Sequence, residues 1–151
     1  MTADQLKIIT DARLKSAVIL MDAEDWYFAG YAMAMALECA LKAAICKTLH
    51  ISAYPEDRRR QNEKIVSFFR THEFEQLKVL AGLDATFSPT GLLEAVQNWS
   101  DFTKEFTGGN WVETRYDLER QTQFDKIKVE RLYTNLTHDP YGIITIIKQQ
   151  W

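Results

Sequence analysis

The chain has 151 residues, of which 46% are hydrophobic and 12% aromatic, which is enough for one domain with a substantial core but leaves little room for a second. Its formal net charge of −3 excludes the broad positive field that holds nucleic acid non-specifically. These totals predict a single soluble domain over residues 1–151, in which any phosphate contact is local.

The first two predicted helices are the longest. A helix from about Ala3 to Met21 has one apolar and one charged side. The central helix, Asp25 to Leu49, is apolar on nearly every side and is long enough to cross a bilayer. Glu38 and Lys42 lie inside it, one turn apart, and charges near a bilayer centre are costly. We therefore expect no membrane span, but a helix enclosed by a bundle, with Glu38 and Lys42 paired.

The two cysteines, Cys39 and Cys46, both lie on this central helix. Their Cα atoms are roughly 10 Å apart at a rise of 1.5 Å per residue, which is too far for a disulfide bond. The first ten residues, MTADQLKIIT, lack the basic and apolar regions of a secretory signal. We expect a cytoplasmic protein with reduced cysteines.

A surface connection is predicted after the central helix, because Tyr54-Pro55 disfavours helix and a charged cluster follows. The arginines at positions 58–60 could touch RNA phosphate, but the acidic residues beside them favour a solvated face. A shorter helix is expected near Lys64.

Thr71-His72 is a predicted boundary, at which Thr71 caps a helix that contains Phe74 to Leu80. For His72, a capping role is favoured over a metal site shared with Glu75, because one His and one Glu are too small a set of ligands. No zinc motif or phosphate-binding glycine loop is visible in the sequence, and no metal or cofactor is expected.

The second half predicts three more helices. Ser88-Pro89 resembles a helix start, with Ser as the cap and Pro in the first turn, and Asp139-Pro140 separates the last two helices. The β-branched run IITII leaves the final helix ambiguous with a strand. The predicted helices span about Ser88 to Phe106, ended by Gly108-Gly109, then Gln121 to Thr137 and Pro140 to Gln150, with a loop from Asn110 to Arg120. The expected fold is an all-α bundle of about five to six helices.

Three polar residues of the penultimate helix, Arg131, Asn135 and His138, fall at positions i, i+4 and i+7 and share one face. His138 could take the proton of an RNA 2′-hydroxyl, Arg131 could offset phosphate charge, and Asn135 could orient the phosphate. The structural alternative is that Arg131 pairs with Glu130 or Glu119 and that His138 caps the helix end.

Arg115 and Tyr116 form a second candidate site. They lie in the predicted loop, where binding residues concentrate, and Tyr can stack on a base while Arg contacts phosphate. We expect them to contact substrate.

The segment AGYAMAMALECALKAAI, followed by THEFEQL and by an Arg and a His in the last long helix, resembles the HEPN superfamily of small prokaryotic helical domains. Many HEPN proteins are metal-independent ribonucleases or toxins of toxin–antitoxin pairs that act as dimers. The resemblance implies that Arg131 and His138 are catalytic. Six residues separate them, at the long end of the family range of four to six, and Leu132 stands where a polar residue is common.

In one HEPN subgroup, a partner nucleotidyltransferase modifies a Tyr two residues beyond the His. This chain has Tyr141 three residues beyond His138. The resemblance therefore makes Tyr141 a candidate for modification and implies a homodimer, with RNA and a nucleotidyltransferase or another antitoxin as further partners.

Three functions follow from these observations. The first is a ribonuclease of a toxin–antitoxin or defence system, with Arg131 and His138 in a cleft between two chains. The second is a non-catalytic HEPN-like module that binds a nucleotide, a nucleic acid or a partner protein through the same cleft. The third is a structural dimer, in which both residues pair only within the fold.

Overall fold

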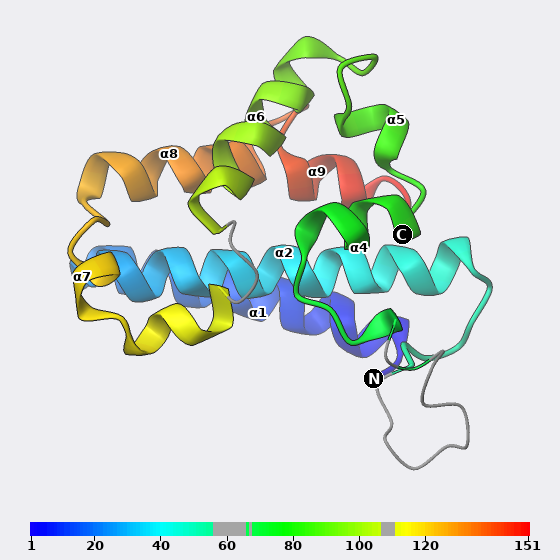
Figure 1. Ribbon diagram of the computed structural model, residues 1–151, viewed down its shortest axis with the longest axis horizontal. Helices are drawn as coiled ribbons and strands as arrows, with labels where there is room; N and C mark the ends of the chain where they lie inside the picture. The colour runs from blue at the N-terminus through cyan, green and yellow to red at the C-terminus, as the bar shows by residue number, and fades with distance from the viewer. Residues whose placement is uncertain (56–65, 67, 107–110) are drawn as a thin grey trace.

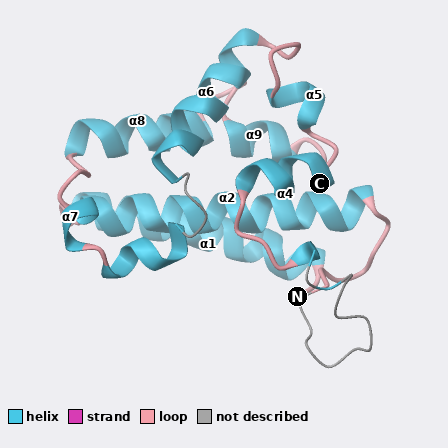
Figure 2. Ribbon diagram, in the orientation of Figure 1, coloured by secondary structure: helices cyan, strands magenta, loops and turns pink. Residues whose placement is uncertain are grey.

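The computed structural model describes residues 1–55, 66, 68–106 and 111–151, and within these residues the fold is helical, without a β-strand (Figures 1 and 2). Short 3-10 helices are labelled η. In chain order the elements are α1 (Ala3–Asp22), α2 (Trp26–Thr48), α4 (Phe74–Leu80), α5 (Asp84–Phe87), α6 (Leu93–Thr103), η1 (Lys104–Phe106), η2 (Trp111–Tyr116), α7 (Leu118–Gln121), α8 (Lys126–Thr137) and α9 (Ile143–Lys148). The predicted all-α class is confirmed.

The helices α1 and α2 follow the sequence prediction closely. Thr2 and Gln5 form a capping box at the start of α1, and the Asp25 carboxylate accepts a hydrogen bond from the Phe28 amide at the start of α2. Most of α2 is buried, and its many alanines let neighbouring helices approach closely. The expectation of an enclosed central helix is confirmed.

The helices α8 and α9 pack on α2, and α6 packs on α8, while α1 lies along α2 (Figure 1). Side chains from these elements meet in one hydrophobic core. Leu37 and Leu41 of α2 and Leu132 and Leu136 of α8 are fully buried in it. The fold therefore fixes one side of α8 against the core and leaves its polar stripe beside α6.

The start of α6 differs from the prediction. Ser88 does not cap it, because the Ser88 hydroxyl donates to Asp84 Oδ1 at 3.0 Å and Ser88 ends the short helix α5. The helix α6 begins five residues later than predicted, at Leu93. The start signal at Ser88-Pro89 therefore belongs to a turn between two helices.

Two further boundaries were also predicted wrongly. The expected loop from Asn110 to Arg120 contains the helical turns η2 and α7, with the Asp117 carboxylate capping α7. The helix α8 begins at Lys126 rather than Gln121, because Asp125 caps it by accepting from the Lys128 amide at 2.8 Å. The run IITII is helical and forms most of α9.

Thr71 lies near the predicted boundary but does not cap α4. Its hydroxyl accepts from the Glu73 amide at 3.0 Å, and α4 begins after Glu73 without a side-chain cap. The arginines at 58–60, Lys64 and the glycines at 108–109 lie outside the described residues. Of the short helix expected near Lys64, Val66, Phe68 and Phe69 are described and are helical. No disulfide bond joins Cys39 and Cys46, as predicted.

Among the described residues, one helix, α2, is long and apolar enough to cross a membrane by length and composition alone. Within the fold, 78% of its most apolar window is buried against other residues. The Glu38 carboxylate and the Lys42 ammonium are 2.9 Å apart inside it. The predicted pairing of these two residues is confirmed.

Candidate functional site

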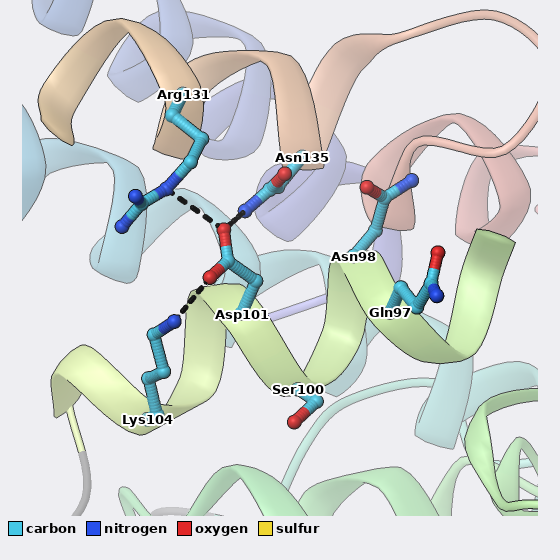
Figure 3. A pocket seen from close by; sticks show the side chains of 7 residues that line it. All are labelled: Gln97, Asn98, Ser100, Asp101, Lys104, Arg131 and Asn135. Carbon is cyan, nitrogen blue, oxygen red and sulfur yellow. Dashed lines mark hydrogen bonds and ion pairs between the residues drawn. The ribbon is translucent and has the colours of Figure 1, made fainter. Parts of the chain in front are cut away.

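The predicted polar stripe of α8 faces α6. Arg131 Nε lies 2.9 Å from Asp101 Oδ2, and Arg131 Nη2 lies 3.7 Å from Glu105 Oε1. Asn135 Nδ2 donates to the same Asp101 oxygen at 2.8 Å. Figure 3 shows Arg131 and Asn135 from α8, and Lys104 from the end of α6, converging on Asp101. Asp101 is therefore the shared acceptor of the cluster.

His138 is the residue at which α8 ends, and its Nε2 lies 3.7 Å from Glu94 Oε1. Glu94 and Asp101 are seven residues apart on α6, as Arg131 and His138 are on α8. The pairs Arg131–Asp101 and His138–Glu94 are thus two successive contacts between antiparallel helices. We call Glu94, Asp101, Arg131, Asn135 and His138 the polar ladder.

The structural alternative for Arg131, an ion pair within the fold, is confirmed, but its partners were predicted wrongly. Arg131 pairs with Asp101 and Glu105 rather than with Glu130 or Glu119, and Glu130 lies 3.9 Å from Lys126. The expectation that His138 ends the helix is confirmed.

An open depression of about 380 Å³ lies beside the polar ladder (Figure 3). Partial burial alone would raise the pKa of Asp101, but hydrogen bonds from Lys104 and Asn135 and the charge of Arg131 outweigh it and lower that pKa. The ionised carboxylate already matches the nearby cations, which weakens their attraction for phosphate. The residues lining the depression are Gln97, Asn98, Ser100, Asp101, Lys104, Arg131 and Asn135.

Tyr141, the candidate for modification, is half-buried in the turn before α9. Its backbone carbonyl accepts from Asn98 Nδ2 at 2.9 Å, and this bond extends the contact between α6 and the end of α8.

Arg115 and Tyr116 lie together on η2, beside the first half of α2 (Figure 1). The Arg115 guanidinium carbon is 4.9 Å from the centroid of the Tyr116 ring, and Nη1 donates to the Tyr31 hydroxyl at 3.4 Å. Tyr116 is 77% exposed. Arg115 does not line the depression at the polar ladder, so the two predicted sites are separate.

Arg115 lines a second, smaller depression of about 180 Å³, which sequence reasoning did not identify. Its walls come from α2, from the segment before α4 and from η2. His72 Nδ1 lies 2.9 Å from Glu38 Oε2, and the Trp111 indole donates to the His72 carbonyl at 2.9 Å. We call it the Glu38–His72 depression; it is lined by Tyr31, Met35, Glu38, Cys39, His72, Trp111, Val112 and Arg115.

Glu38 is held in its ionised form. Burial alone would raise the pKa of this carboxyl, but the hydrogen bond from His72 and the charge and hydrogen bond of Lys42 outweigh it and lower the pKa. An ionised carboxylate only accepts hydrogen bonds, so His72 Nδ1–H is the donor. The imidazole is therefore fixed in orientation at the edge of the depression.

Both sequence interpretations of His72 were wrong. Its imidazole contacts Glu38 instead of capping α4, and Glu75 accepts from the Trp99 indole at 2.6 Å and pairs with Lys78. The described residues contain no group of three or more His, Cys, Asp or Glu that could hold a metal ion. A buried carboxylate in an apolar helix needs hydrogen-bond or ion-pair partners, and this was the signal in the sequence that Glu38 would have a partner besides Lys42.

Comparison with known protein families, with curated proteins and with solved structures gives no match to this chain. The resemblance to HEPN domains therefore stays a prediction from the sequence of α2, of the segment around His72 and of α8. Function must be argued from the two sites.

Proposed function

We propose that this chain is a HEPN-like helical module that binds a nucleotide or single-stranded nucleic acid without cutting it, through Arg115 and Tyr116. The observation that carries the proposal is the exposed pairing of a guanidinium with an aromatic ring beside a depression. Proteins that bind single strands stack bases on such rings and contact phosphate with such cations.

The chain's net charge of −3 fits a local contact of this kind. The Tyr31 hydroxyl orients Arg115, so less side-chain freedom is lost when a ligand binds. Tyr116 has the exposure that a stacking platform needs.

The contacts of the polar ladder support binding over cleavage. Arg131 and His138 are about 10 Å apart along the helix axis at 1.5 Å per residue, and each lies against a different carboxylate of α6, so both would have to leave these partners to meet at one phosphate. The Asn135 side chain, 6% exposed, already donates to Asp101, so turning it toward a substrate would break a buried hydrogen bond.

The test is the affinity of purified protein for a fluorescently labelled single-stranded RNA, followed by anisotropy. Since stacking on an aromatic ring contributes about 1–3 kcal/mol, Tyr116→Ala is expected to weaken binding by about 5- to 150-fold. Arg115→Ala is expected to weaken it and to reduce its salt dependence, because one phosphate contact is lost. Arg13→Ala, an exposed arginine on α1, is the matched control. Equal affinities of all four proteins would contradict the proposal.

A ribonuclease is the second candidate function. The side chains of Arg131 and His138 are 45% and 50% exposed, and each lies against a carboxylate that can orient it. A homodimer that joins two such faces would supply Arg and His to one phosphate. In this candidate function Tyr141 is the residue that a partner nucleotidyltransferase would modify to silence a toxin.

Cleavage is tested with single-stranded RNA in EDTA. If the candidate holds, the products carry 2′,3′-cyclic phosphate ends, and His138→Ala lowers the rate at least about 100-fold because the general base is lost. His50→Ala, at the end of α2, is the control. Intact RNA with the wild-type protein, or unchanged cleavage by His138→Ala, would exclude it.

A further inference from the structure

We infer that the Glu38–His72 depression is a subsite for a terminal phosphate, the phosphate monoester at the end of a nucleotide or an RNA strand. The inference depends on the proposed function and names the chemical group that the module recognises. It adds Tyr31 and His72 to the residues that contact ligand.

Three side chains from separate segments that can donate hydrogen bonds to a phosphate line the depression: Tyr31 of α2, His72 before α4 and Arg115 of η2. A phosphate monoester carries three acceptor oxygens, which match a guanidinium, a hydroxyl and an imidazolium as donors. The remaining wall is largely apolar and includes Trp111 and Val112. Such a wall lowers the local dielectric and strengthens charged hydrogen bonds.

The size of the depression favours an end group. Its volume of about 180 Å³ is less than half that of the depression at the polar ladder, about 380 Å³. A terminal phosphate enters with one attachment to the rest of the ligand, whereas an internal phosphodiester must leave room for chain on both sides. Arg115 joins the two parts of the site, since it touches the Tyr31 hydroxyl on one side and the Tyr116 ring on the other.

The charges around His72 are compatible with an anion. The Glu38 charge is already matched by the Lys42 ammonium at 2.9 Å, and the same carboxylate accepts from His72 Nδ1. The other titratable groups that line the depression are Tyr31 and Cys39 of α2 and Arg115 of η2. A bound dianion favours the protonated imidazole over the neutral one.

The experiment compares one short RNA bearing a 5′-phosphate, a 3′-phosphate or only hydroxyl ends, together with a nucleoside and its 5′-monophosphate, by calorimetry. The better phosphorylated ligand is expected to bind at least about tenfold more tightly than its hydroxyl form, because charged hydrogen bonds are gained. The mononucleotide arm distinguishes a free nucleotide from an RNA end. Inorganic phosphate should compete with the phosphorylated ligand.

The test variants are His72→Gln and Tyr31→Phe, and His50→Gln is the matched control. His72→Gln should bring the affinity ratio of phosphorylated to hydroxyl ligand close to one. Tyr31→Phe, which loses only a hydroxyl, should reduce the ratio even if His72→Gln fails to fold. His50→Gln should leave the ratio unchanged.

The outcomes separate the two proposals. Equal binding of phosphorylated and hydroxyl ligands by the wild-type protein would overturn the phosphate subsite while nucleic-acid binding at Arg115 and Tyr116 stands. A phosphate preference that survives in both His72→Gln and Tyr31→Phe would also overturn it. Absence of binding to every ligand would overturn both.

Discussion

Replacing Glu38 by alanine is expected to lower the free energy of unfolding by about 3 kcal/mol, because it breaks a buried ion pair. Glu38 and Lys42 are 9% and 7% exposed, and their charged atoms are 2.9 Å apart. The substitution removes this carboxylate from Lys42 and from His72 together. Urea denaturation followed by circular dichroism measures the loss.

Glu130→Ala is the matched control. Glu130 forms an i, i+4 pair with Lys126 in the reverse order, at 3.9 Å and on the surface. Exposed pairs of this kind contribute at most about 0.5 kcal/mol. Similar losses in Glu38→Ala and Glu130→Ala would show that the buried pair has no special role.

Acid should reduce the difference between the wild-type protein and Glu38→Ala. The folded pKa of Glu38 is lowered, so its stabilising contribution is complete above the unfolded pKa, about 4.3, and is lost as the pH falls through the folded pKa. The two proteins should therefore differ most near neutral pH and converge as the pH falls below about 4. A difference that grows with acid would contradict this origin.

The contacts of Glu38 also separate what the sequence could predict from what it could not. Its pairing with Lys42 follows from a spacing of four residues on one helix. The contact with His72 spans 34 residues and depends on how the segment before α4 folds back onto α2. No local sequence pattern indicates this long-range contact, so the Glu38–His72 depression could not be predicted from the sequence.

The polar ladder, too, could be predicted only in part from the sequence. The spacing of Arg131, Asn135 and His138 predicted one shared face, and the structure has that face. The acidic residues nearest to Arg131 in sequence were wrong predictions for its partners, which come from α6 and η1. Glu94 and Asp101 repeat the same seven-residue interval on α6, and two stripes of matching period and opposite charge were the available sign of antiparallel packing.

The predicted helix boundaries were wrong where a residue pattern typical of a helix start belonged to a different element. Ser88-Pro89 closes α5 instead of opening α6, and Asp125, rather than a residue near Gln121, caps α8. The long helices α1 and α2 were predicted to within about a residue, because each begins at a side-chain cap, Thr2 or Asp25, and α2 is also buried along most of its length.

Leu132→Ala is expected to lower the free energy of unfolding by about 3 kcal/mol, because a fully buried leucine loses its packing and leaves a cavity. Leu132 follows the ladder residue Arg131 and belongs to the stripe that packs α8 against α2, with Val129 and Leu136. The measurement is again urea denaturation. An apolar residue at this position is thus required by the place of α8 in the core.

Ile127→Ala is the control on the same helix, where the side chain is 77% exposed and its truncation should cost no more than about 0.5 kcal/mol. A third variant, Leu132→Thr, places at this position the kind of polar residue that HEPN motifs often carry. It should destabilise at least as much as Leu132→Ala, since its hydroxyl would be buried among apolar side chains. If Leu132→Thr is instead well tolerated, the leucine is not needed for packing, and its departure from the HEPN pattern would have to be explained by function.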